Sequence, residues 1–151
     1  VNLQPAALGE ALRQTWKSFD ARAAARKLSM EWRIAEGLEA TTDRDVLQVV
    51  AGNLFSNAVD YAPEGTGIVC RAERDGKGIV LSVANRAPEL GMEDLGYLFE
   101  PFWRKDKARS DSSHSGLGLA LVAASAALLG TEPVARLSDS GELTVEIRLG
   151  D

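Results

Sequence analysis

Several residue types are scarce in this chain of 151 residues, and each scarcity excludes a class of function. The single cysteine, Cys70, cannot form an internal disulfide, which fits a reducing compartment. Basic residues number 17 against 22 acidic ones, so the sequence lacks the basic surface that nucleic-acid binding requires. The longest apolar run, residues 117–129, is shorter than the ~20 residues that span a bilayer. We therefore expect no nucleic-acid partner and no membrane contact by this chain itself.

The remaining composition is that of an ordinary globular domain. Hydrophobic residues make up 45% of the chain and charged residues 26%, which is enough to bury one core without disulfides. The length favours a single domain over residues 1–151. Because the chain begins with Val1 and enters a helical pattern almost at once, we interpret it as a fragment of a longer protein.

Hydrophobic periodicity predicts the order of the secondary structure. It indicates an amphipathic helix that begins at Pro5 and continues to Phe19, and a largely buried helix that begins at its N-cap Asp43 and ends near Tyr61. Shorter helical patterns cover residues 92–99 and 116–129, and alternating patterns predict strands over residues 29–34, 39–42, 66–73, 79–84, 134–137 and 143–149. This order is typical of an α+β fold, a two-layer α/β sandwich in which about three helices cover one face of a mixed, mostly antiparallel sheet.

Two asparagines interrupt the apolar pattern of the predicted helix that begins at Asp43. Asn53 and Asn57 are four residues apart and Tyr61 continues the same stripe, so all three lie on one side of the helix. Asparagine is unfavourable inside a helix, and a buried amide needs a compensating partner. That partner is either a metal ion or polar ligand, or a neighbouring loop that the amides hold in a purely structural role.

A pair of glycines opens the last predicted helix. Gly116 and Gly118 allow backbone N–H groups and the positive helix end to approach a phosphate, although two glycines also suit a tight turn. The preceding residues 103–115 combine basic side chains with serines. We interpret this stretch as a phosphate-binding lid, with a solvated basic loop as the alternative, and its candidate ligands are Arg104, Lys105 and Arg109.

An aromatic cluster lies at the edge of this polar stretch. Phe99 and Phe102 are typical of core packing, whereas Trp103 stands directly beside the basic residues. The cluster therefore predicts either an anchor for the hinge of the loop or a docking point for a partner.

Taken in order, these segments resemble the nucleotide-binding domain of sensor histidine kinases, in the superfamily shared by gyrase, heat-shock chaperone and mismatch-repair ATPases. Residues 53–61 (NLFSNAVDY) are similar to the N box, residues 99–102 (FEPF) to the F box, and residues 115–122 (SGLGLALV) to the second glycine box. The resemblance covers essentially the whole chain and implies the Bergerat type of α/β sandwich.

The resemblance implies a protein histidine kinase that binds ATP and Mg²⁺. Asn57 would coordinate the Mg²⁺ that bridges the ATP phosphates, and Tyr61 would lie against the adenine or ribose. Asn53 stands where the hydrolytic relatives carry a glutamate that activates water, and an amide cannot serve as that base. Phosphoryl transfer is therefore favoured over hydrolysis. The other residues implied in nucleotide binding are Asn85, Ala87, Phe99, Arg104, Lys105, Arg109, Ser115, Gly116, Leu117, Gly118 and Leu119.

Two departures from the family pattern affect the predicted site. The first glycine box, usually Asp-x-Gly-x-Gly, begins here at Asn85 and has Ala87 and Glu89 in place of both glycines. The Asn85 carbonyl oxygen can still accept a hydrogen bond from the adenine amino group. Position 60 usually carries a basic residue but is Asp60 here, whose charge would repel the phosphates unless Mg²⁺ intervenes.

The phosphoacceptor is expected outside this chain. The one histidine, His114, lies inside the predicted lid, so the resemblance implies a separate dimerisation and phosphoacceptor domain of the same kinase as the partner, and a response regulator downstream. It also implies a cytoplasmic domain within a full-length protein anchored in the plasma membrane.

Two other interpretations compete with the kinase. A degenerate nucleotide-binding or protein-interaction module would keep the fold without transferring phosphate, as the changes at Asn85, Ala87, Glu89 and Asp60 suggest. A hydrolytic ATPase or a serine kinase of the same superfamily ranks lower, because Asn53 replaces the general-base glutamate.

Overall fold

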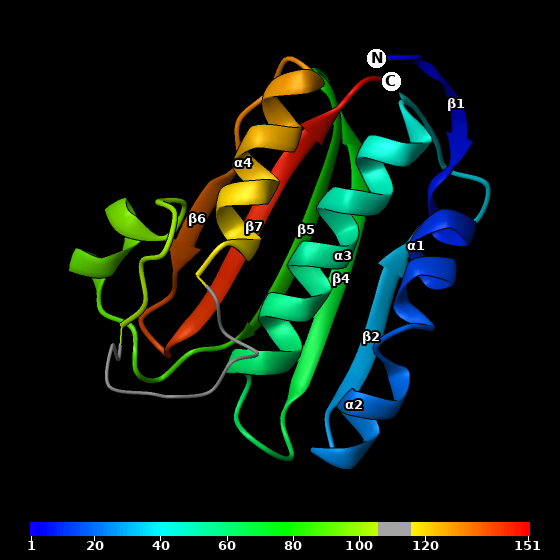
Figure 1. The fold of residues 1–151 in the computed structure, drawn as a ribbon. Coiled ribbons are helices and arrows are strands. Elements are labelled where there is room, and N and C mark those ends of the chain that lie inside the picture. The colour runs from blue at the N-terminus through cyan, green and yellow to red at the C-terminus, as the bar shows by residue number, and fades with distance from the viewer. Residues whose placement is uncertain (106–115) are drawn as a thin grey trace.

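A computed structural model describes residues 1–105 and 116–151. Within them, five strands form the main sheet in the order β2-β4-β5-β7-β6, and the helices lie on one of its faces (Figure 1). The strands are β2 (Ser29–Ile34), β4 (Gly67–Asp75), β5 (Gly78–Arg86), β6 (Val134–Leu137) and β7 (Glu142–Leu149). The pair β2 and β4 runs parallel, and the other neighbouring pairs run antiparallel. The expected α+β sandwich is therefore confirmed.

Helix α3 (Arg44–Tyr61) and helix α4 (Gly118–Leu128) pack side by side on the sheet, with α1 (Leu8–Trp16) on the other side of α3 (Figure 1). The predicted N-cap of α3 is confirmed, because the Asp43 Oδ1 accepts hydrogen bonds from the N–H groups of Asp45 at 2.9 Å and Val46 at 3.1 Å. Helix α3 ends directly before Ala62 and Pro63, and proline cannot continue a helix.

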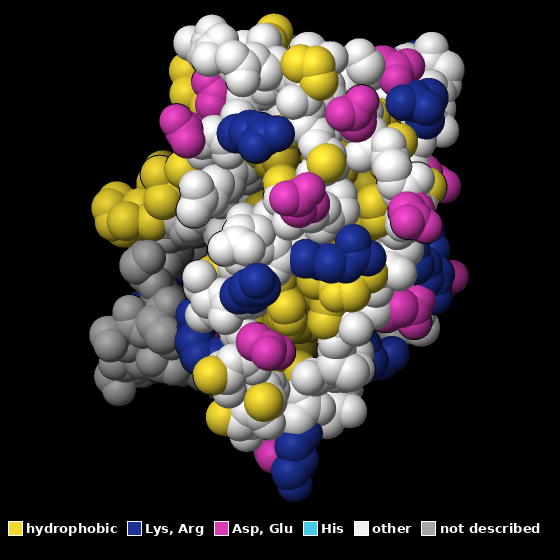
Figure 2. Space-filling model, turned by 90° about the vertical axis from the view of Figure 1, so that its right-hand side faces the viewer, with side chains coloured by type: hydrophobic (Ala, Val, Ile, Leu, Met, Phe, Trp, Pro, Cys, Tyr) yellow, Lys and Arg dark blue, Asp and Glu magenta, His cyan; other side chains and the backbone are white. Residues whose placement is uncertain are grey.

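An aromatic cluster fixes the buried face of α3. Phe55 is fully buried and meets Trp16 of α1 edge-on with 5.3 Å between ring centroids, and Trp32 of β2 at 6.0 Å. Figure 2 shows the face that carries α1, α2 (Asp20–Ala25) and β2, where hydrophobic side chains gather in the middle with Lys and Arg side chains beside them. Because α1, α3 and β2 share this cluster, α3 is held from the side opposite α4.

The N-terminal prediction is wrong at its start. Pro5 does not begin a helix but lies in a short strand, β1 (Gln4–Ala7), which pairs antiparallel with β3 (Glu39–Thr42) apart from the main sheet. Proline is tolerated at the edge of such a two-stranded ladder, where its missing N–H costs little. Helix α1 begins three residues later, at Leu8.

The same helix also ends earlier than predicted. It stops at Trp16, Phe19 lies in the following turn, and a second helix, α2 (Asp20–Ala25), begins there. The Phe19 ring still packs near Phe55, with 6.2 Å between centroids, so the apolar spacing continues although the helix does not. The pattern over residues 92–99 forms a 3-10 helix, η1 (Met92–Tyr97), instead of an α-helix.

Both ends of the chain lie at one end of the sheet (Figure 1). The Asn2 N–H donates to the Asp43 Oδ2 at 2.8 Å, at the start of α3, and Thr41 pairs with Gly150 in an isolated bridge. Helix α3 has 18 residues and is therefore about 27 Å long, so Tyr61 lies that far from Asp43. Within the described ranges, no helix is both long and apolar enough to cross a membrane.

Candidate functional site

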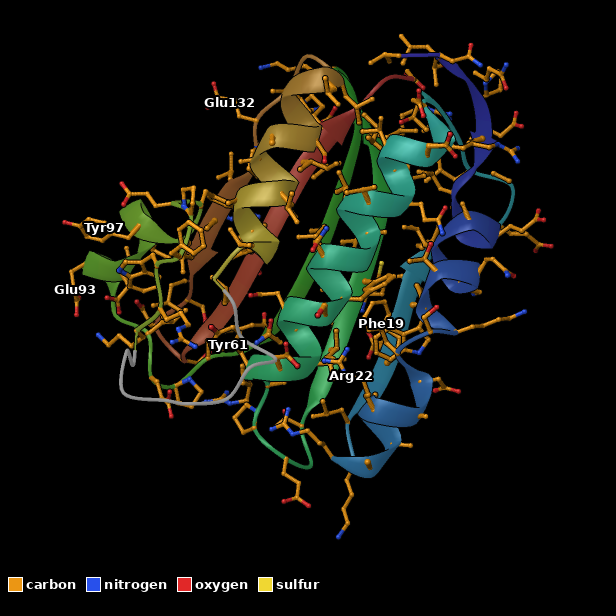
Figure 3. The ribbon with its side chains drawn as sticks, viewed as in Figure 1. Phe19, Arg22, Tyr61, Glu93, Tyr97 and Glu132 are labelled. Atoms are coloured by element: carbon orange, nitrogen blue, oxygen red, sulfur yellow. The ribbon has the colours of Figure 1, made fainter. Side chains whose placement is uncertain are left out.

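A hollow lies between the last turns of α3, the first turn of α4 and the segment that follows β5. It is at the end of the sheet away from the chain termini, as the position of Tyr61 shows (Figure 3). Its lining consists of Asn57, Tyr61, Leu90, Leu98, Trp103, Lys105, Gly116, Gly118, Leu119 and Leu143. The structure thus brings residues of the predicted N box, the lid and the second glycine box to one place.

Helix α3 supplies one wall of this hollow through two side chains. Asn57 and Tyr61 are one turn apart and both line it, while Phe55, Ala58 and Val59 point into the core. Because the core packs the opposite side of the helix, the amide and the phenol are held in place by α3 as a whole.

Asn53 lies one turn earlier on the same stripe, as predicted, but does not line the hollow. Its Nδ2 donates to the Val49 carbonyl of the preceding turn at 2.8 Å. A methyl group built on Gly118 would lie 3.7 Å from the Asn53 Oδ1, so this amide faces the start of α4. The Asn53 amide nitrogen is therefore bound to its own helix and not to the neighbouring loop that the structural alternative had predicted, and its oxygen lies beside the start of α4.

The glycines at the start of α4 form the opposite wall. Gly116 has φ +77°, and its carbonyl accepts a hydrogen bond from the Phe102 N–H at 2.9 Å. A Cβ at Gly116 would lie 2.8 Å from the Phe102 backbone, so only glycine allows this approach. Leu117 precedes the helix and Leu119 is buried at its start. The first N–H groups of a helix have no partner within it, so this end can donate to an anion.

The end of β5 lies beneath the hollow. Asn85 is buried and pairs in register with Leu143, whose side chain lines the hollow, and its Nδ2 donates to the Arg86 carbonyl at 2.9 Å. This bond uses one of the two N–H donors of the amide. Ala87 is buried and lines a neighbouring hollow that shares Tyr61, Leu90 and Lys105 with the first.

Not every predicted site residue reaches the hollow. Phe99 lines a separate depression along the C-terminal half of α4 and packs against the hydrophobic core, so it is not among the residues that line the hollow, and its role at the nucleotide stays a prediction. Arg104 is half-buried and does not line either hollow. The predicted ligands Arg109 and Ser115 lie outside the described residues, as does His114. A sequence pattern cannot tell which side of α4 the aromatic residues 99–103 approach.

Helix η1 supports two residues of the hollow. The Tyr97 ring stacks on the Trp103 ring with 6.1 Å between centroids and 15° between their planes. The buried Asp94 Oδ2 accepts hydrogen bonds from the Gly91 N–H and from the Lys105 Nζ, both at 2.9 Å. The Gly91 N–H and then Lys105 hold the pKa of Asp94 below its usual value. Sequence reasoning missed Asp94, although an acidic residue three positions into a short helix is a capping signal.

Protonation of Asp94 is expected to weaken the fold. Because the folded-state pKa lies below the unfolded one, the carboxylate stabilises the protein above the unfolded pKa, and this contribution is lost as the pH falls through the folded pKa. Asp94→Asn should cost about 1 kcal/mol of unfolding free energy at pH 7 and flatten the decline below about pH 4. Urea unfolding at several pH values measures both effects, and parallel pH curves for the two proteins would contradict this role.

The short helix α2 contacts the end of α3. Arg22 Nη2 lies 2.5 Å from Asp60 Oδ1, and Arg26 donates to the carbonyls of Val59 and Ala62, the latter at 2.7 Å. Asp60 lines the neighbouring hollow. The carboxylate that was expected to repel phosphates is therefore paired with a guanidinium that sequence reasoning missed, because α2 was not predicted as a separate helix.

The hollow offers few protein ligands, which fits a metal ion that is coordinated mostly by water and by the phosphates of a bound nucleotide. Among residues 1–105 and 116–151, no group of three or more His, Cys, Asp or Glu side chains could hold a metal ion. Asn57 offers one amide oxygen at the hollow. Mg²⁺ usually keeps several waters and binds through few protein oxygens together with substrate phosphates, which matches such a site.

The chain is similar to known kinases. It is 40% identical to the sensor-like histidine kinase SenX3 of Mycobacterium tuberculosis over 86 residues, which are 56% of this chain and 21% of that protein. It is 32% identical to the signal transduction histidine-protein kinase BaeS of Escherichia coli over 105 residues, 69% of this chain and 22% of that one. The chain thus spans about a fifth of the length of these curated relatives.

Solved structures share the fold. A mycobacterial sensor histidine kinase, MprB, superposes with a TM-score of 0.83 at 21% identity, with 97% of each chain covered. Full-length ShkA in complex with AMPPNP superposes with a TM-score of 0.79 at 24% identity, over 99% of this chain and 32% of that one. The family described as "Histidine kinase-, DNA gyrase B-, and HSP90-like ATPase" matches residues 42–150. Because that match covers most of the chain, this protein belongs to that ATPase family, and sensor histidine kinases are its recognised relatives.

Proposed function

We propose that this chain binds Mg²⁺-ATP in the hollow and transfers the γ-phosphate to a histidine on a separate dimerisation and phosphoacceptor domain. The observation that carries the proposal is that Asn57 and Tyr61 on α3 face the glycine-bearing start of α4 across one hollow. An oxygen donor for a hard metal ion and a helix N-terminus for an anion are the two features that a magnesium-nucleotide needs.

Each wall of the hollow has a role in this proposal. Asn57 would hold the Mg²⁺, and the ion would supply charge neutralisation on the phosphates. The first N–H groups of α4 would donate to the phosphate oxygens, which Gly116 and Gly118 allow because they leave the backbone accessible. Tyr61 and the apolar Leu90 and Leu143 would pack against the nucleoside.

Adenine recognition would rest on Asn85. The amide nitrogen of Asn85 already donates to the Arg86 carbonyl, which leaves its oxygen as the acceptor for the adenine amino group. Lys105 would meet the phosphates from the other side, since it lines both hollows. The nucleotide-binding roles of the lid residues Arg104, Arg109 and Ser115 stay predictions, as do those of Leu117 and Leu119.

Transfer is favoured over hydrolysis by the chemistry of Asn53. A hydrolytic site needs a group that takes a proton from water, and the Asn53 amide has no such capacity, with its nitrogen already bound to the helix backbone. Positioning of the nucleotide for an incoming histidine is then the task of the domain. The histidine, a downstream response regulator and any membrane anchor belong to the whole kinase, and the domain would work in the cytoplasm, where ATP is available.

A second candidate function is a nucleotide-binding or interaction module without transfer. It is favoured by Ala87 and Glu89 after β5, where two glycines would otherwise bring the backbone close to a ligand. Both candidates share the fold, so a binding measurement separates them before any transfer assay is needed.

Calorimetric titration of the 151-residue chain with ATP, with and without Mg²⁺, tests the proposal. We expect binding at micromolar to millimolar ATP that requires Mg²⁺, followed by labelling of a phosphoacceptor domain supplied in trans. No heat at millimolar ATP would favour the interaction module, and binding without any labelling would favour a nucleotide-binding module that performs no transfer.

A further inference from the structure

The end of α3 carries a carboxylate where the proposed ligand is strongly anionic. Asp60 follows Asn57 by three residues, precedes Tyr61 and lines the hollow that adjoins the proposed nucleotide site. Its side chain is only 11% exposed. A carboxylate of this kind, left without a counter-charge, would repel a polyphosphate and resist burial.

Helix α2 supplies that counter-charge from a distant part of the sequence. The Arg22 Nη2 lies 2.5 Å from the Asp60 Oδ1 across 38 residues of chain. Its guanidinium also lies over the Phe19 ring, 5.6 Å from the centroid. Figure 3 shows Arg22 beside the last turns of α3 with Phe19 next to it. The ring and the carboxylate together hold the arginine in one place.

A second arginine, the C-cap residue of α2, strengthens this contact. Arg26 follows Arg22 by one helical turn and donates to the carbonyls of Val59 and Ala62. These are among the last carbonyls of α3, which form the negative end of its dipole. Arg26 also lines the neighbouring hollow together with Lys105. Two cations, one within α2 and one at its C-cap, therefore offset the negative charge at the end of α3.

We propose that Arg22 is a positioning residue for nucleotide binding, which holds Asp60 and cancels its charge so that the end of α3 accepts the polyphosphate of the ligand. This inference rests on the proposed function. It assigns to α2 a role in the site although α2 contributes no wall to the main hollow. Arg22 would therefore affect binding of the polyphosphate of the nucleotide and leave binding of the nucleoside unchanged.

Four variants and two ligands test this assignment. Arg22→Gln should weaken Mg²⁺-ATP binding about threefold to tenfold, a size typical of one partly screened charge, and should leave adenosine binding unchanged. Asp60→Asn should bind ATP at least as tightly as the unchanged chain, and the double variant should match it, since the charge to be cancelled is gone. Arg33→Gln is the matched control, because Arg33 pairs with Glu31 on β2.

The outcomes separate this inference from the proposed function. If the unchanged chain binds no ATP, both fail together. If it binds ATP and Arg22→Gln binds as tightly, or loses ATP and adenosine in equal measure, the assignment of Arg22 alone is overturned. Failure of Asp60→Asn to restore ATP binding in the double variant would also overturn it. Should Arg22→Gln not fold, the assignment is tested instead by Arg22→Lys, which should retain ATP binding, and by Asp60→Asn alone, which should not weaken it.

Discussion

Replacing Asn57 by alanine is expected to weaken Mg²⁺-ATP binding by at least about tenfold, the loss typical of a disturbed metal site. Asn57 lines the hollow, and nothing else on that wall of α3 replaces its amide oxygen, because the Tyr61 phenol is the other side chain there. The effect should appear with Mg²⁺ and shrink without it, since the lost interaction is with the ion. Calorimetry in the presence and absence of Mg²⁺ measures the difference.

A matched control for this variant lies on the same helix. Gln48 is an exposed residue of α3 and does not line either hollow, so Gln48→Ala removes an amide of similar chemistry away from the site. Both variants should unfold at similar denaturant concentrations. Unchanged magnesium-dependent binding in Asn57→Ala would rule out the metal role of this residue.

Gly116→Ala is expected to lower the unfolding free energy by about 1–3 kcal/mol, the usual cost of a strained left-handed residue. Two causes add at this position. The backbone has φ +77°, and the new methyl carbon would lie 2.8 Å from the Phe102 backbone, which is too rigid to give way. Phe102 itself has φ +67°, so the neighbouring segment has little freedom to adjust. Urea unfolding monitored by circular dichroism measures the loss.

Gly118→Ala is the matched comparison for this substitution. Gly118 is the first residue of α4, and its methyl would meet the Asn53 Oδ1 at 3.7 Å, an ordinary contact. Alanine also has the higher helix propensity, so stability should hold or rise slightly. Equal stability of Gly116→Ala and Gly118→Ala would show that the contact between Phe102 and Gly116 does not constrain the backbone.

The main elements of the fold were predictable because their patterns are long. The buried face of α3 and the alternation in β4, β5 and β7 each repeat over several residues, and the bounds of these strands lie within two residues of the predicted ones. Strand β1 has four residues and α2 has six, which is too short for periodicity to separate them from the helix between them. Proline suits the first position of a helix as well as the edge of a strand. Only the pairing of Pro5 with Thr41, which is far away in the sequence, shows that it lies in a strand.

The candidate site was predictable to the extent that it depends on spacing along one helix. The one-turn spacing of Asn57 and Tyr61 and the position of the glycines at the start of α4 indicated that these residues lie at one site, and all four line the hollow. Contacts between distant segments were not predictable, which is why the position of Phe99 at a separate depression was not foreseen and Asp94 and Arg22 were missed. Asp60 is the clearest case, since its charge is visible in the sequence and its partner is not.

The position of the chain ends has a mechanical consequence. Both ends lie at one pole of the sheet, and the hollow lies at the other, about the length of α3 away. A flexible segment joined to either end would therefore act as a pivot for the whole domain. Because the hollow lies far from the chain ends, a small rotation there would displace it more than any part of the domain near the ends. Such a rotation would move a bound nucleotide toward or away from a neighbouring group without any change inside the domain.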